Sequence, residues 1–253
     1  MTNDPITRAA ESWYGYGNWA APYWFIGPEP GMRKDEGENL FARCEAWENL
    51  GHPEMLDCAA HHRMFAHMKY HVRTNRMAIP VGDRSMRPPT QAMWRRLIAL
   101  LLAFKDERTD NDAIGDYQCA EWGSEKGETC VAELSALAAN SLAVERDRAA
   151  FRRKRCEHLR MRLLQNTPVF AVMYGLRDQK SYETIVGAPF DSTGYAWAGN
   201  TLCALVEHPV ARPGKPTEWW IEKGVAIRFI LRMGNEHRLR EPVSICEADG
   251  TMK

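Results

Sequence analysis

Four short segments with the character of buried strands constrain this fold more than any other feature of the sequence. They lie at 22–26, 129–137, 168–175 and 201–209, and the last two are nearly continuous apolar runs. Such runs are typical of strands in a parallel sheet that is covered on both faces. The run at 22–26 ends abruptly in a turn rich in Pro and Gly, so a loop is expected there.

Segments with helical periodicity separate or follow these strands, and they lie at 37–50, 90–105, 145–165 and 217–233. The segment 37–50 places apolar residues on one face of a helix. In the segment 90–105, the most convincing helix, Thr90 follows two prolines and is expected to be the N-cap.

Strands that alternate with helices predict an α/β fold, a three-layer α/β/α sandwich with a central, mainly parallel sheet. The chain of 253 residues is long enough for one domain, and no low-complexity linker divides it. We expect an irregular, aromatic segment at 1–20 that packs on the domain and a C-terminal tail at 235–253.

Composition argues against a membrane-spanning protein and neither favours nor excludes a nucleic-acid-binding protein. Lys and Arg together equal Asp and Glu at 33 each, so any contact with nucleic acid must come from a local basic surface. No apolar run approaches the roughly 18 residues that cross a bilayer, and the N-terminus lacks the core of a signal peptide. We therefore expect a cytoplasmic protein without a membrane partner.

Neither the cysteines nor the histidines predict a cofactor. The seven cysteines are widely spread and form no CxxC pair, which indicates reduced thiols. Four histidines cluster without an HExxH motif or a cysteine partner, so a metal site is not expected; they are His61, His62, His67 and His71.

Two predicted strands end in motifs that can carry chemistry. The first strand is followed by Gly27-Pro28-Glu29-Pro30-Gly31, and the last ends in His208-Pro209. In parallel sheets, functional residues gather where the strands end at their carboxyl edge. Prolines and glycines also form a stiff loop that can approach a sugar closely. These two strand ends are therefore the candidate site.

The two motifs, in this order and at strand ends, resemble the signature motifs of the uracil-DNA glycosylase superfamily. The resemblance covers roughly 20–233 in the order of elements, although only the short motifs carry it. It implies a monofunctional DNA glycosylase, which hydrolyses the N-glycosidic bond of a flipped base. No amine nucleophile is evident, so an abasic product without strand cleavage is expected.

The chemistry of this reaction suits Glu29 and His208 as catalytic residues. A carboxylate at Glu29 would stabilise positive charge on the deoxyribose and orient or deprotonate the attacking water. His208, as a neutral imidazole, would donate a hydrogen bond to the base oxygen on which electrons accumulate. Both side chains must then face one base-sized hollow. His52-Pro53 follows a helix and is not expected to take part.

Several positions bear on which base is bound. Gly31 stands where uracil-specific members of the superfamily carry a bulky tyrosine, so pyrimidines substituted at C5 become sterically possible. Phe41 falls where relatives place the aromatic ring that stacks on the base. Glu133 falls where relatives carry an asparagine, and a carboxylate suits the amino group of cytosine because it only accepts hydrogen bonds. Asn140 is the competing candidate.

The predicted substrate is therefore either a C5-modified cytosine of viral DNA, in antiviral defence, or uracil or a mismatched base, in repair. A second hypothesis is a catalytically silent nucleic-acid-binding domain of the same fold.

DNA-binding residues are expected in two places. The loop that follows His208 contains Pro209, Arg212 and Lys215, and in the superfamily this loop enters the minor groove. The predicted helix at 145–165 carries many cations, although such a run usually forms a solvated helix face; they are Arg146, Arg148, Arg152, Arg153, Lys154, Arg155, Arg160 and Arg162. The expected partner is double-stranded DNA, with single strands left open, and the protein is expected to be a monomer.

Overall fold

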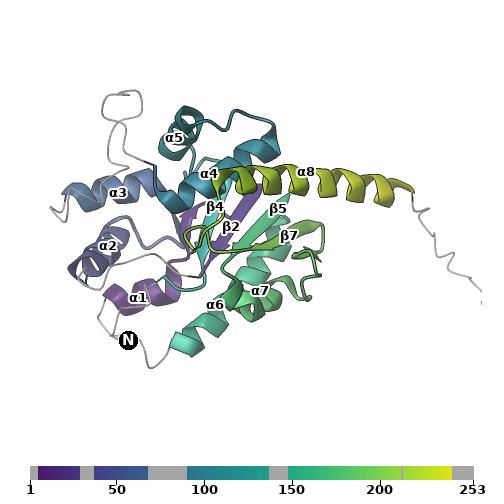
Figure 1. The fold of residues 1–253 in the computed structure, drawn as a ribbon. Helices are drawn as coiled ribbons and strands as arrows, with labels where there is room; N and C mark the ends of the chain where they lie inside the picture. The colour runs from purple at the N-terminus through teal and green to yellow at the C-terminus, as the bar shows by residue number, and fades with distance from the viewer. Residues whose placement is uncertain (1–4, 29–36, 68–89, 137–147, 212, 241–253) are drawn as a thin grey trace, which may run out of the picture.

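The computed structural model describes residues 5–28, 37–67, 90–136, 148–211 and 213–240. Over this part of the chain, one seven-stranded sheet lies between two layers of helices (Figure 1). The strand order is β3-β1-β4-β2-β5-β7-β6. The expected three-layer α/β/α sandwich with a mainly parallel sheet is confirmed.

The strands are short, as is usual for a buried sheet. Their bounds are β1 Gly15–Gly17, β2 Tyr23–Gly27, β3 Met55–Leu56, β4 Thr129–Glu133, β5 Phe170–Tyr174, β6 Tyr195–Ala198 and β7 Thr201–Val206. The helices are α1 Pro5–Ser12, α2 Gly37–Asn49, α3 Cys58–His67, α4 Ala92–Lys105, α5 Asn111–Ala120, α6 Arg148–Asn166, η3 Leu176–Asp178, α7 Gln179–Val186 and α8 Thr217–Arg240. None of these described helices is long and apolar enough to cross a bilayer.

The four strands predicted from the apolar segments form the middle of the sheet. β4, β2, β5 and β7 are consecutive neighbours, and each pair among them is parallel. β1 pairs antiparallel with β4, and β6 pairs antiparallel with β7. The carboxyl ends of the four parallel strands therefore meet at one edge of the sheet.

Two hydrophobic cores lie on opposite faces of the sheet because successive side chains of a strand alternate in direction. On β2, Trp24 and Ile26 join the core that contains residues of α6 and α7. Phe25, between them, joins the core that contains residues of α4 and α8. Burial on both faces explains why these strands are apolar throughout.

The expectation of an irregular segment at 1–20 is wrong, because α1 and β1 form there. β1 contains two glycines at positive φ, and a Cβ on Gly15 would lie 2.0 Å from the carbonyl oxygen of Val131. β1 has only three residues, and two of them are glycines that allow the close approach to β4. The sequence therefore shows no alternation of apolar and polar residues that would predict this strand. The expected tail at 235–253 is also partly wrong, because α8 continues to Arg240.

The expected N-cap of α4 is also wrong. The helix begins at Ala92, and the N-cap is Gln91, whose side chain makes no capping bond. The backbone N–H of Gln91 instead donates to the Oε1 atom of Gln118 in α5, at 2.8 Å. A partner from another helix therefore replaces the local cap that the sequence suggested.

α8 packs along α4 on one side of the sheet (Figure 1). Gly224 of α8 allows this close contact, since a Cβ on it would lie 2.1 Å from the carbonyl oxygen of Leu100 in α4. Helices approach this closely only where a residue at the crossing has no side chain.

We expect Gly224→Ala to lower the free energy of unfolding by about 1–3 kcal/mol, because the added methyl group overpacks the α4–α8 contact. Denaturant unfolding would measure this change. The control is Val225→Ala on the exposed side of the same helix, which should change stability by no more than about 0.5 kcal/mol. At a helical position with free space, replacing glycine by alanine raises stability. If Gly224→Ala stabilised the protein, the close contact between α4 and α8 would be contradicted.

Candidate active site at the carboxyl edge of the sheet

The ends of four adjacent strands bring together the residues that we name the edge row: Glu133, Gly27, Tyr174 and His208. Gly27 pairs in register with Glu133, and β5 ends beside them at Tyr174. His208 follows β7, whose last residue pairs in register with Tyr174. The edge row therefore crosses the sheet from β4 to β7.

The ring of Tyr174 lies over the backbone of Gly27. A Cβ on Gly27 would lie 2.2 Å from the Tyr174 hydroxyl oxygen, so this position requires glycine. The ring thus extends across β2 toward the strand that carries Glu133. Burial, together with the negative charge of Glu133, raises the pKa of Tyr174 well above its usual value. Its hydroxyl group stays protonated at neutral pH.

The backbone of Tyr174 is held from the next helix. Its carbonyl oxygen accepts a hydrogen bond of 2.7 Å from the hydroxyl group of Tyr182 in α7, and both side chains are buried. The strand end that carries the ring is therefore fixed on both sides of the sheet.

His208 is held as a neutral imidazole with a defined donor. The backbone N–H of Val210 donates to Nδ1 at 3.3 Å, which leaves the ring proton on Nε2. Burial lowers the pKa of His208 below its usual value, and the charge of Asp178 opposes this shift. The ring also contacts Tyr174 edge to face, with 5.6 Å between the ring centroids. Among the described residues, none forms a hydrogen bond with Nε2, whose N–H is the donor of the neutral ring.

Asp178 connects His208 with the start of the first motif. A Cβ on Gly175, which has a φ of 108°, would lie 3.7 Å both from Oδ2 of Asp178 and from Cδ of Pro28. Arg152 of α6 forms an ion pair with Asp178. The loops after β2 and β5 therefore lie close to each other.

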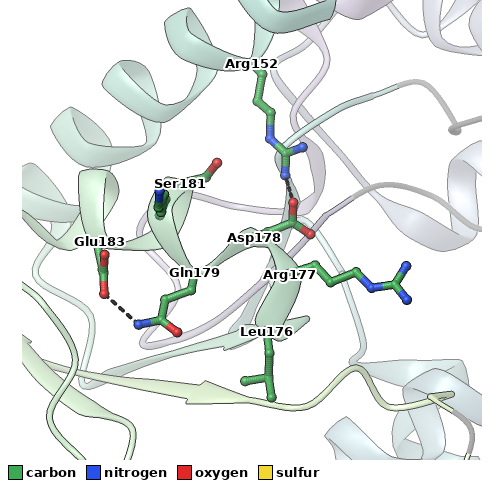
Figure 2. Close-up of a pocket in the computed structure, with 8 residues that line it drawn as sticks. Arg152, Leu176, Arg177, Asp178, Gln179, Ser181 and Glu183 are labelled. Carbon is green, nitrogen blue, oxygen red and sulfur yellow. Dashed lines mark hydrogen bonds and ion pairs between the residues drawn. The ribbon is translucent and has the colours of Figure 1, made fainter.

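A cavity of about 550 Å³ includes this ion pair in its lining. Its lining residues come from α6, η3 and α7, and they are Arg152, Leu176, Arg177, Asp178, Gln179, Lys180, Ser181 and Glu183. In Figure 2 the side chains of Arg152 and Asp178 meet, whereas that of Arg177 extends away from them. Arg177 and Lys180 are exposed, and they follow the carboxyl end of β5, so two accessible cations line this cavity.

The opposite end of the edge row is anchored by a buried guanidinium group. Arg155 of α6 is 2% exposed and donates from Nη2 to the backbone carbonyl oxygen of Glu133 at 2.9 Å. It also donates from Nη1 to the carbonyl oxygens of Trp13, at 2.9 Å, and Ala10, at 3.2 Å. Arg155 thereby fixes the end of β4 to the segment that joins α1 and β1.

The structure brings together part of the predicted site. Gly27, Pro28, Glu133 and His208 lie at the carboxyl edge. Pro209, which follows His208, is buried, and its carbonyl oxygen accepts a hydrogen bond from Arg96. Five predicted positions lie outside the described residues: Glu29, Pro30, Gly31, Asn140 and Arg212.

Two further predictions concern residues whose surroundings the structure does show. Phe41, predicted to stack on the base, lies on α2 and is 43% exposed. Lys215, predicted to bind DNA, forms an ion pair with Glu207 at 3.5 Å and lies 5.7 Å from the ring centre of Trp219. The charge of Lys215 is therefore partly neutralised within the protein.

The cations of α6 form less of a positive face than their number suggests. Besides Arg155 and Arg152, Arg162 pairs with Glu54, and Arg160 donates to a backbone carbonyl group of α7. These arginines connect α6 to the domain, which leaves fewer charges for DNA.

His61, one member of the histidine cluster, has a structural role in the part of the chain that the structure describes. His61 is buried, its Nδ1 atom lies 2.9 Å from the Tyr16 hydroxyl group, and its Nε2 atom lies 3.0 Å from the carbonyl oxygen of Arg43. Both ring nitrogens therefore have partners. Among the described residues, no group of three or more potential ligands is placed to hold a metal ion.

Sequence reasoning missed Tyr174 and Asp178 as neighbours of the candidate site, and it placed Arg152 and Arg155 on a basic helix face without foreseeing their partners Asp178 and Glu133. The one local signal was Gly175, which ends the predicted strand at 168–175 and precedes a polar segment. A comparison with models of protein families finds no match, and a search of curated proteins finds none either. The case for a function therefore rests on the geometry of this edge.

We expect NMR titration to find the pKa of His208 below 6.5, with the proton of the neutral ring on Nε2. Since Asp178 favours the charged ring, Asp178→Asn should lower this pKa further. The control is Glu183→Gln, which removes a carboxylate from the same cavity and should leave His208 unchanged. A pKa above 6.5, or a proton on Nδ1, would contradict the assigned state.

Proposed function

We propose that this chain is a monofunctional DNA glycosylase that hydrolyses the N-glycosidic bond of a flipped pyrimidine. The observation that carries the proposal is His208, a neutral imidazole that lies at the carboxyl edge against the ring of Tyr174 and has its ring proton on Nε2. A fixed donor of this kind suits the oxygen of a leaving base, because negative charge accumulates there as the bond breaks.

The reaction also needs a group that handles the sugar and the water. Glu29 is our candidate because Pro28, which precedes it in the sequence, lies at the same edge and close to Gly175 in the loop after β5. In the proposed reaction, water adds to the sugar carbon as the bond to the base breaks. The carboxylate stabilises the positive charge on the sugar and takes a proton from the water. The base leaves as an anion and takes up a proton, and Glu29 releases the proton that it took from the water, so the products are the free base and an abasic site in an uncleaved strand.

The exposed cations beside the edge row support DNA as the partner. Arg177 and Lys180 lie next to the cavity and can contact phosphates on either side of a flipped nucleotide. The protein is proposed to act as a monomer on double-stranded DNA in the cytoplasm. Its substrate is a C5-modified cytosine of viral DNA, in antiviral defence, or uracil or a mismatched base, in repair.

The direct test incubates the protein with duplexes that carry uracil, a thymine mismatch or C5-modified cytosines, and detects the freed base by mass spectrometry. We expect His208→Ala to slow release by about 100-fold or more, because one preorganised donor is lost. Glu29→Gln should abolish release and retain binding. His52→Ala, at the other His-Pro pair, lies outside the edge row and should act as the wild type does.

The outcomes of this test separate the proposal from its alternative. Binding of DNA without release of any base, by the wild type as well as by Glu29→Gln, would indicate a silent binding domain. Equal rates for His208→Ala and His52→Ala would contradict the role of His208.

The phosphate contacts can be tested by salt dependence. If Arg177 contacts one phosphate, Arg177→Gln should weaken binding to all sequences and reduce the slope of log affinity against log salt by about 1. The control is Arg108→Gln, since Arg108 is highly exposed and follows α4 near the amino ends of the strands. An unchanged slope for Arg177→Gln would place the DNA elsewhere.

A further inference from the structure

The chain that follows β7 forms a tight turn around the catalytic candidate His208. The backbone N–H of Ala211 donates to the carbonyl oxygen of His208 at 2.9 Å, and that of Val210 donates to its Nδ1 atom at 3.3 Å. A Cβ on Gly214 would lie 2.6 Å from the carbonyl oxygen of Ala211, so the chain passes close to itself there. We name this turn, from 208 to 214 without residue 212, the histidine loop.

Arg96 of α4 reaches the histidine loop at two points. Its Nη1 atom donates to the carbonyl oxygen of Pro209. A Cβ on Gly214 would lie 3.5 Å from Nη1 and 3.6 Å from Nη2 of the same guanidinium group. The guanidinium group therefore lies close to both the residue that follows His208 and the far end of the loop.

The helix that carries Arg96 is part of the core. α4 is buried from Leu97 to Ala103 and packs along α8, so its backbone cannot shift without disturbing a close-packed interior. A guanidinium group also suits this task, because it is always charged and presents its donors in a fixed plane. A rigid helix thus supplies the donor that holds a surface loop.

A second contact across the histidine loop is weaker. Glu207, just before the loop, pairs with Lys215, just after it, at 3.5 Å, and their side chains are 34% and 40% exposed. Ion pairs with this exposure contribute little to stability. A hydrogen bond from a guanidinium group to a carbonyl oxygen is charge-assisted and stronger than a bond between neutral groups. Of these two contacts, that of Arg96 is the one that fixes the loop.

We propose that Arg96 is a positioning residue that holds the histidine loop, so that the His208 ring keeps its bond from Val210 and offers Nε2–H as a fixed donor to the leaving base. The part in base release rests on the proposed glycosylase function, whereas the hold on the loop does not. Arg96 acts through His208 and does not contact the base. A donor stabilises developing charge best when its geometry is set before the reaction, and a displacement of about 1 Å can cost roughly 100-fold in rate.

The hold on the loop is tested by amide hydrogen exchange of the protein without DNA. In Arg96→Met, we expect the amides of Val210 and Ala211 to exchange at least about 10-fold faster, because the loop opens while the domain stays folded. The amides of β7 should keep their wild-type rates. Arg96→Lys should restore part of the protection, since lysine can still donate to Pro209. Unchanged exchange of both loop amides in Arg96→Met would overturn the inference.

The rate of base release tests the consequence for the reaction. The substrate is the base that the wild type releases fastest among uracil, mismatched thymine and C5-modified cytosines. Arg96→Met should lower kcat by roughly 10- to 100-fold and change KM by less than about 3-fold, because the donor is displaced while DNA is still bound. The matched control is Arg95→Met on the same helix, which should alter neither kcat nor the exchange of the loop amides.

A second variant displaces the loop and leaves Arg96 in place. Gly214→Ala sets a methyl group against the carbonyl oxygen of Ala211, so the loop must shift, and both the faster exchange and the lower kcat should be reproduced. Thermal unfolding of each variant separates a loss of folding from a local loosening.

The outcomes separate this inference from the function on which part of it rests. Faster exchange in Arg96→Met with an unchanged kcat would overturn the positioning role and leave the glycosylase function intact. Release of no base by the folded wild type would overturn the glycosylase function and the part of Arg96 in base release. The exchange rates alone then decide whether Arg96 holds the loop.

Discussion

The arrangement of the candidate site depends on one buried cation. The guanidinium group of Arg155 binds the carbonyl oxygens of Ala10 in α1, Trp13 just after α1 and Glu133 at the end of β4. Hydrogen bonds to a charged group contribute about 1.5–3 kcal/mol each, and carbonyl groups left without partners would add a cost of their own. Tyr14 contributes as well, since its ring lies 4.2 Å from the Arg155 guanidinium carbon. This network fixes the end of β4 and therefore the place of Glu133.

The sheet supplies the rest of the geometry. Four parallel strands end at one edge, and their side chains alternate between the two cores, so the last residues of neighbouring strands share a face. Position 27 must be glycine, because the ring of Tyr174 occupies the space that a side chain would take. His208 follows on the next strand, where its ring contacts Tyr174. A rigid edge of this kind can hold an imidazole donor and a carboxylate without a moving part.

The sequence predicts the layers of the fold well because the relevant signals are local. A strand buried on both faces must be apolar throughout, and the helix at 92–105 contains a long apolar run that is buried at 97–103, so both are visible in the chain. The short elements α1 and β1 were missed because their stability comes from distant partners, namely Arg155 and the backbone of β4. The cap of α4 was misplaced for the same reason.

For the candidate site, the position at a strand end was predictable and the surroundings were not. Parallel strands place their carboxyl ends together, so Gly27 and His208 could be assigned to one edge from the order of elements alone. Nothing local indicates that Asp178 lies by His208, or that Arg43 lies by Glu133, since each pair joins segments that are far apart in the sequence or on different elements. The Nε2 tautomer of His208 likewise depends on a contact with Val210 that only the folded loop creates.

The central claim is that His208 presents its Nε2–H to a base that has left the DNA stack. The most direct measurement is a crystal structure of the Glu29→Gln variant bound to a duplex that contains 5-hydroxymethylcytosine. The account predicts an extruded base at the edge row, with a base oxygen about 3 Å from Nε2 of His208. A base held at another surface, or a His208 ring that directs Nε2 away from it, would contradict the account.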